Sequence, residues 1–209
     1  MSVIDTSGWG DFVIEEVFDI HSTISGIDKN KLNHAVGDIP YITRSEDNNA
    51  ITQYVTEDQD SRYQLEKGGV ITVGLDTQTV HYQPNAFFTG QNVHTVDHPR
   101  FNECVALFVV PCIKAVLRKY DWANGATLGR IRKEVIKLPI TSTGEPDWQY
   151  MEDVMRDELK KQESKLDSLI ALNARQAAQI DTYKWEQFRV GDLFDIHPTS
   201  AYKANNRQL

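Results

Sequence analysis

Two short polar segments, at 39–49 and 89–92, carry side chains suited to reading another molecule through hydrogen bonds. These side chains are amides and one guanidinium: Arg44, Asn48, Asn49, Gln91 and Asn92. In the DNA major groove, arginine can donate two hydrogen bonds to guanine, and asparagine or glutamine can pair in the same bidentate way with adenine. The set therefore has the chemistry needed to read base edges, although each residue taken alone is more typical of a turn or a solvated surface.

A basic stretch at 114–137 offers chemistry for phosphate, with seven lysines and arginines against two acids in a chain of net charge −8. Because DNA affinity depends on cations that neutralise phosphates, an acidic chain needs such a local basic face to bind DNA. A mixed charge run is also typical of an ordinary solvated surface. The residues expected to position the backbone are Lys119, Arg130, Arg132 and Lys133.

Motifs for catalysis are missing from the sequence. There is no phosphate loop of the Walker type, no Gly-x-Ser-x-Gly turn and no zinc-ligand spacing of cysteines. His94 and His98 have the spacing of a helical metal pair, but Pro99 argues against a helix there. Cys104 and Cys112 are expected to be free thiols in a reducing cytosol. The chain is therefore predicted to be non-catalytic.

An internal repeat organises the chain. The segment 9–21 returns at 185–197 with a constant offset of 176 residues, including the tryptophan, the first phenylalanine and the Phe-Asp-Ile-His tetrad. This period is too long for a solenoid, whose units span about 20–50 residues. We therefore expect a duplicated domain whose second copy has begun by Leu209, in either a fragment, which is favoured, or a natural half-length protein.

The elements that position the polar segments are predicted to be mixed, an α+β domain. Segments 68–74 and 78–83 alternate β-branched residues and are bounded by turn residues, which predicts two strands and a hairpin. Residues 85–96 are expected to be strand broken at 90–92. Residues 101–120 are expected to change from strand to helix at Pro111.

A long helix is predicted from 147 to about 183, where the sequence contains no glycine or proline. Its apolar seam follows the 4-3 spacing of a coiled coil, and at about 1.5 Å per residue it would be on the order of 50 Å long. A coiled-coil spacer is favoured over a helix docked on its own domain. The seam residues are Met155, Leu159, Gln162, Leu166, Leu169, Asn173, Gln176 and Ile180.

The ordered motifs resemble those of Type I restriction–modification specificity (S) subunits, and the resemblance covers nearly the whole chain. The matching segments, beyond the repeat itself, are 37–44, 88–93, 106–108, 136–140 and 144–152. The resemblance implies a target-recognition domain at 1–146, a spacer helix at 147–183 and the start of a second recognition domain at 184–209.

The resemblance also implies the partners. These are double-stranded DNA, of which each recognition domain reads one half of a bipartite site, together with methyltransferase (M) and restriction (R) subunits. The seam of the spacer would dock the M subunits, which bind S-adenosylmethionine, so no cofactor is expected in this chain. With one spacer, the chain is expected to pair with a second copy. A cytoplasmic location is expected, with no membrane partner, because no apolar run reaches the length of a membrane span.

Three alternatives stay open. The stretch 138–148 also resembles recognition parts of Type II enzymes of the BcgI kind, which would change the partner and keep the DNA-reading role. A coiled-coil adaptor that binds only protein would show no salt-dependent DNA binding. A nuclease would require metal-dependent cleavage by the isolated chain.

Overall fold

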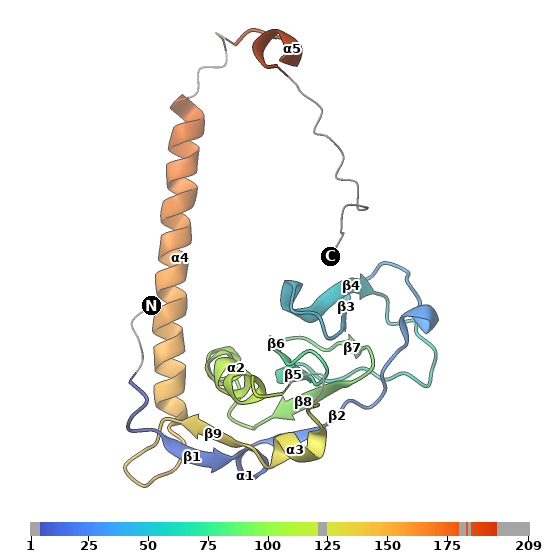
Figure 1. Cartoon of the computed structure of the whole chain (residues 1–209), viewed down its shortest axis with the longest axis vertical. Coiled ribbons are helices and arrows are strands. Elements are labelled where there is room, and N and C mark those ends of the chain that lie inside the picture. Colours follow the sequence, from blue (N-terminus) through green and yellow to red (C-terminus); the bar gives the residue numbers. More distant parts are fainter. Residues whose placement is uncertain (1–4, 121–124, 180–182, 184, 196–209) are drawn as a thin grey trace, which may run out of the picture. The chain divides into compact units, whose positions relative to one another are not determined.

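The structure, a computed structural model of the whole chain, describes residues 5–120, 125–179, 183 and 185–195 (Figure 1). The chain divides into two compact units, residues 1–161 and 162–209. The first unit contains all the strands among these residues. Strands and helices are both well represented in it, as the α+β prediction requires.

A four-stranded antiparallel sheet forms the centre of the first unit. Its strand order is β2 (Asp19–Ser22), β8 (Val93–Asp97), β5 (Val70–Gly74) and β6 (Thr79–Gln83). β5 and β6 pair from Val70 opposite Gln83 to Gly74 opposite Thr79. The predicted hairpin is therefore confirmed.

A second sheet contains β4 (Ile51–Val55), β3 (Ile39–Ile42) and β7 (Phe88–Thr89), in that order. β3 and β4 are antiparallel, whereas β7 runs parallel to β3. The predicted break at 90–92 is confirmed, and it is the point at which the chain leaves this sheet and enters β8 of the other sheet. The 3-10 turns η1 (Lys29–Lys31) and η2 (Asn48–Ala50) precede β3 and β4, respectively.

A third, two-stranded sheet joins distant parts of the sequence. β1 (Gly10–Val13) pairs with β9 (Val135–Leu138), and α1 (Ile14–Val17) follows β1 directly. The short helix α3 (Leu128–Arg132) leads into β9 and lies next to β2.

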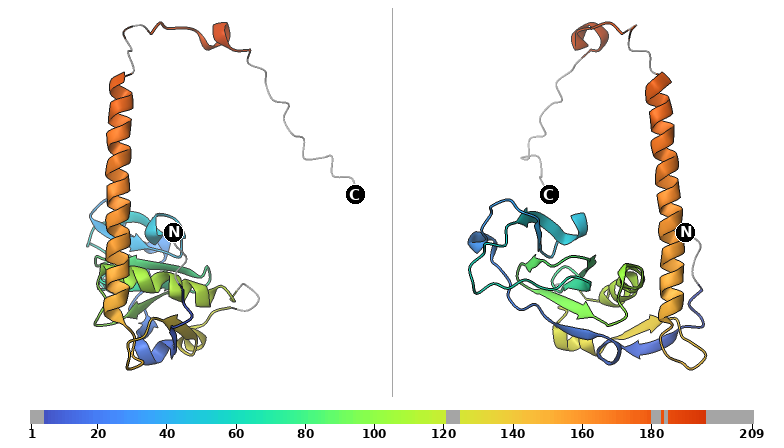
Figure 2. Two further views of the ribbon diagram at one scale, coloured as in Figure 1. Left: turned by 90° about the vertical axis from the view of Figure 1, so that its left-hand side faces the viewer. Right: turned by 180° about the vertical axis from the view of Figure 1, so that it is seen from behind.

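The helix α2 (Glu103–Leu117) corrects the prediction for 101–120, because it is continuous and runs through Pro111. It packs along β6, β5 and β9 (Figure 2). Asn102 caps its start by accepting a hydrogen bond from the Val105 amide at 3.0 Å. Buried residues recur at helical spacing, at Val105, Val109, Ile113 and Leu117. Burial of this face outweighs the one hydrogen bond that Pro111 removes.

The predicted long helix is confirmed as α4 (Trp148–Gln179), whose 32 residues correspond to about 48 Å. Met151 is fully buried, and Val154 and Met155 pack against the same hydrophobic core, which holds side chains of α2 and the central sheet. By contrast, every residue from 161 to 177 is exposed. The residues of α4 that pack against this core therefore lie near the start of the helix.

The repeat has a structural counterpart. α5 (Val190–Leu193) lies 176 residues after α1. The phenylalanine that follows each helix donates its backbone amide to the first carbonyl of that helix. Phe18 donates to Ile14 at 2.8 Å, and Phe194 donates to Val190 at 3.0 Å. Ile14 is buried, whereas Val190 is 62% exposed. Residues 196–197, the end of the repeated segment, lie outside the described residues. None of the helices in the described ranges has both the length and the hydropathy to span a membrane.

Candidate nucleic-acid interface

Three loops that connect strands of the two larger sheets meet around one carboxylate. Asp76, in the β5–β6 hairpin, forms an ion pair with Arg44 of the β3–β4 loop. The same Asp76 oxygen accepts a hydrogen bond from the Asn92 amide at 3.1 Å, and Asn92 lies in the β7–β8 loop. We refer to Arg44, Asp76, Gln91 and Asn92 as the recognition cluster.

Gln91 joins this cluster through a polar hollow. Arg44 and Gln91 both line the hollow, which has a volume of about 240 Å³, together with Tyr41 and Lys29. The Tyr41 hydroxyl donates a hydrogen bond at 2.7 Å to the carbonyl of Ile27, which also lines the hollow. The structure thus brings together three residues that the sequence predicted separately.

The β3–β4 loop is tied to the rest of the domain over most of its length. Asn48, Asn49 and Ala50 have positive φ values of 49°, 54° and 64°, a conformation that L residues adopt at a cost. The Asn49 amide donates to the Tyr82 carbonyl at 2.9 Å, and Gln83 donates back to the Asn49 carbonyl at 3.1 Å. These bonds hold the strained turn in place.

The two asparagines of the loop were predicted to bind DNA, and in the structure they have local partners. The Asn48 amide donates to the Ile51 carbonyl at 3.0 Å, and Asn49 is bonded as described above. Both residues stay exposed. One donor of each amide is therefore already used by the fold.

The predicted phosphate-binding residues form a separate group on and beside α3. Lys119 forms an ion pair with Glu134, and Arg132 donates two hydrogen bonds to the Ile20 carbonyl, at 3.1 and 2.7 Å. Arg130 lies over the Tyr120 ring at 4.9 Å and donates to the Gly125 carbonyl at 2.8 Å. Lys133 is exposed and has no ion-pair partner among the residues that the structure describes.

Glu134 is the acid that organises this group. Burial alone would raise its pKa, but hydrogen bonds from Lys119 and the Tyr120 hydroxyl outweigh burial and leave the pKa lowered. The carboxylate is therefore charged at neutral pH and compensates part of the local positive charge.

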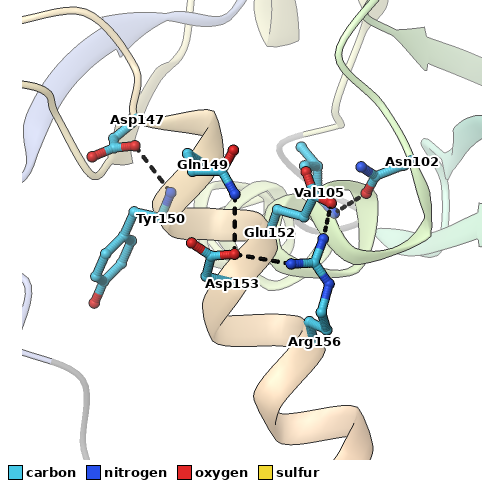
Figure 3. A network of polar contacts seen from close by, with 8 residues as sticks. All are labelled: Asn102, Val105, Asp147, Gln149, Tyr150, Glu152, Asp153 and Arg156. Atoms are coloured by element: carbon cyan, nitrogen blue, oxygen red, sulfur yellow. Dashed lines mark hydrogen bonds and ion pairs between the residues drawn. The ribbon is translucent and has the colours of Figure 1, made fainter.

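The predicted seam of α4 divides into two parts. Met155 and Leu159 are half-buried, whereas the next residues of the seam are exposed; these are Gln162, Leu166, Leu169, Asn173 and Gln176. Ile180 lies outside the described residues. Polar contacts fix the root of the helix (Figure 3): Asp147 accepts from the Tyr150 amide at 2.9 Å, and Arg156 pairs with Glu152 and Asp153.

The sequence analysis missed Asp76. An aspartate between Leu75 and Thr77 in a predicted hairpin is an ordinary turn residue, and no local signal shows that Arg44 and Asn92 reach it. Among the described residues, no group of three or more histidine, cysteine, aspartate or glutamate side chains is placed to hold a metal ion.

Comparisons with known proteins agree with this architecture. Residues 6–168 match the family described as Type I restriction modification DNA specificity domain. The chain is 26% identical over 189 residues to S.BcgI, a Type II restriction enzyme specificity subunit from Heyndrickxia coagulans, covering 89% of this chain and 54% of the relative.

Solved structures share the fold at low identity. The S subunit of a Type I restriction–modification system from M. genitalium matches with a TM-score of 0.50 and 13% identity, over 81% of this chain and 44% of that one. The HsdS subunit from Thermoanaerobacter tengcongensis matches with a TM-score of 0.50 and 14% identity, over 87% and 42%. The chain thus spans about half the length of its relatives. Since the family match covers more than three quarters of its residues, this chain belongs to the Type I restriction modification DNA specificity domain family.

Proposed function

We propose that this chain reads one half of a bipartite sequence in double-stranded DNA, as the specificity component of a restriction–modification system. The observation that carries the proposal is the recognition cluster, in which a guanidinium and the Asn92 amide bind one carboxylate and Gln91 lines a hollow beside the same guanidinium. Such groups supply the donors and acceptors that distinguish base pairs in the major groove.

The hydrogen bonds and the ion pair that hold the β3–β4 loop support this role. A site that reads bases requires side chains whose positions are set before binding, because each side chain that must be ordered on binding reduces the affinity. The loop is held by bonds to Tyr82 and Gln83 and by the Glu46–Lys114 ion pair. Exposed Lys133 is available for a phosphate contact that positions the domain.

The exposed part of α4 is the surface on which we expect protein partners to bind. We propose that its seam pairs with the spacer helix of a second copy and docks the methyltransferase subunits, which would bind S-adenosylmethionine and carry out methylation in the cytoplasm. Restriction subunits would join that complex and cleave DNA. The chain itself would contribute recognition and no catalysis. Exposed Leu166 and Leu169, at 57% and 49%, are the apolar side chains that such pairing would bury.

A Type II system of the BcgI kind is the second candidate for the assembly. The similarity to S.BcgI favours it, because it extends over 89% of this chain. The recognition role of the chain is the same in both cases, and the subunit that co-purifies with it distinguishes them.

The proposal is tested by co-purifying the chain with its cognate methyltransferase subunit and selecting ligands from a pool of randomised duplexes. We expect a short enriched motif and an affinity that falls as salt rises, because binding releases counterions from DNA. A stable complex that enriches no sequence would contradict the reading role. A chain that retains neither the methyltransferase subunit nor DNA would favour the hypothesis of a coiled-coil adaptor.

A further inference from the structure

We infer that Arg44 reads a guanine of a G·C pair and that Asp76 is the positioning residue that orients Arg44 for it. The inference rests on the proposed function and deepens it by naming a base and a residue that sets specificity. It starts from the three separate contacts that fix the Arg44 residue along its length.

The first contact fixes the main chain of Arg44. The Thr77 hydroxyl, from the same hairpin as Asp76, donates a hydrogen bond to the Arg44 carbonyl at 2.8 Å. The second contact fixes the aliphatic stem. A Cβ atom added at Gly74 would lie 3.1 Å from Cγ of Arg44, so the absence of a side chain at Gly74 lets the stem lie against β5.

The third contact fixes the guanidinium. Nη1 of Arg44 forms the ion pair with Asp76, and Asn92 donates to the same carboxylate oxygen at 3.1 Å. The guanidinium has five N–H donors in a planar fork, so this ion pair leaves donors for a ligand. The side chains of Arg44 and Asp76 are 38% and 46% exposed, and solvent therefore reaches both.

The charge of Asp76 decides between base and phosphate. A phosphate bound to Arg44 would lie next to the Asp76 carboxylate, and the two negative charges would repel each other. The major-groove edge of guanine is neutral and offers two acceptors, N7 and O6, to an arginine fork. The cytosine of the same pair offers an N4 donor, which a neighbouring carboxylate can accept. The cluster is therefore complementary to a G·C pair.

The test compares variants in selections from a randomised duplex pool, with the chain in its complex with the methyltransferase subunit. Arg44→Ala is expected to reduce the preference for guanine at one position of the motif about tenfold or more, with the other positions unchanged. Arg44→Lys, which keeps the charge and loses the fork, is expected to lose most of the same preference.

Asp76→Asn separates positioning from a purely structural role. It preserves the shape of the side chain and removes its charge, so we expect weaker guanine preference at the same position, while affinity for non-specific duplex stays equal or rises. Arg62→Ala is the matched control, because Arg62 forms an exposed ion pair with Asp60 that has the same chemistry. It is expected to leave all base preferences unchanged. Thermal melting of each variant verifies that it is folded.

The outcomes separate the two claims. A wild-type motif that Arg44→Ala leaves unchanged at every position would overturn the inference and keep the proposed function. A uniform loss of affinity across all sequences in Arg44→Ala would also overturn it, because that result indicates a phosphate contact. If Asp76→Asn leaves the guanine preference unchanged, the claim that Asp76 positions Arg44 is overturned. If the wild-type complex enriches no motif, the proposed function and the inference both fail.

Discussion

At the residue scale, the thiol of Cys112 is a half-buried group whose ionisation the fold disfavours. It donates a hydrogen bond to the Phe108 carbonyl at 3.4 Å, and burial raises its pKa to about 11. Because the thiolate is the reactive form, we expect iodoacetamide at pH 8 to alkylate Cys112 roughly 100-fold more slowly than an ordinary exposed cysteine. Peptide mass spectrometry measures the rate. Equal rates in the folded chain and in a guanidinium-unfolded control would contradict this expectation.

His98 gives a second prediction at this scale. Its ring stacks on Trp148 with 4.3 Å between centroids, and burial lowers its pKa. The folded state therefore disfavours the protonated ring, so its contribution to stability is complete above the unfolded pKa of about 6.5 and is lost as pH falls below that value. Burial also lowers the pKa of His81 and His94. We expect the melting temperature to fall between pH 7 and pH 5.

The variant His98→Phe keeps an aromatic ring against Trp148 and removes one titrating group. It is expected to melt with a smaller difference between pH 7 and pH 5 than the wild-type chain. Thermal denaturation followed by circular dichroism measures the melting temperature of both proteins at pH 7 and at pH 5. The same difference in melting temperature between pH 7 and pH 5 in the two proteins would show that His98 does not couple protonation to folding.

Single residues also show how far the sequence predicts the site. Arg44, Gln91 and Asn92 are identifiable because their side chains suit base recognition and stand in polar segments. Arg132 was predicted as a phosphate contact, yet it donates to the carbonyl of Ile20, 112 residues away along the chain. Only the tertiary structure shows which cations the fold engages. The roles of the predicted DNA-binding residues remain predictions.

At the scale of elements, α4 combines a partly buried N-terminal part and an exposed seam in its later turns. Met151 lies in the core, whereas Leu166 and Leu169 are largely exposed. A lone helix of this kind gains most of its stability from packing an apolar face against a partner. Its heptad spacing was evident in the sequence because the period persists over several turns.

The double variant Leu166→Asp, Leu169→Asp tests the pairing role of α4. We expect it to lower the mass of the chain in solution, measured by light scattering over a range of concentrations, because charges in a seam oppose helix pairing. Both sites are exposed, so the melting temperature of the recognition domain should change by no more than about 2 °C. The control is Lys160→Asp, which makes the same change of charge at a position that neither lies in the seam nor directly precedes a seam residue of the exposed part. The same mass for wild type and double variant would contradict the coiled-coil prediction.

Prediction was less successful where an element depends on distant partners. The sequence of 101–120 contains a short apolar run followed by Pro111, which is compatible with strand or helix. The helix α2 forms because its buried face packs along β6, β5 and β9, and sequence periodicity does not reveal these contacts in advance.

At the scale of the whole molecule, the most informative feature of the sequence is the 176-residue repeat, since α1 and α5 adopt the same turn. The mixed α+β class was also predictable from alternating strand patterns. The division of the strands into separate sheets was not, because β1 pairs with β9 and β3 pairs with β7 across long stretches of chain. Such pairings are set by tertiary packing rather than by local pattern.

The charge of the molecule is consistent with a binder that selects sequence rather than attracting DNA through its overall field. The chain has a net charge of −8, and much of its basic stretch is neutralised by partners such as Glu134 and Asp11. Non-specific affinity for DNA is expected to be weak, because it depends on unpaired cations. Discrimination would then depend on base contacts such as those of the recognition cluster.

The central claim is tested most directly by the ratio of two dissociation constants, measured with the chain in its methyltransferase complex. One duplex carries the enriched motif and the other carries the same bases scrambled, each at about 50 and 200 mM salt. We expect the motif to bind at least about 1,000-fold more tightly than the scrambled duplex, with both affinities falling as salt rises. Equal affinities for the two duplexes at both salt concentrations would contradict the claim that this chain reads DNA sequence.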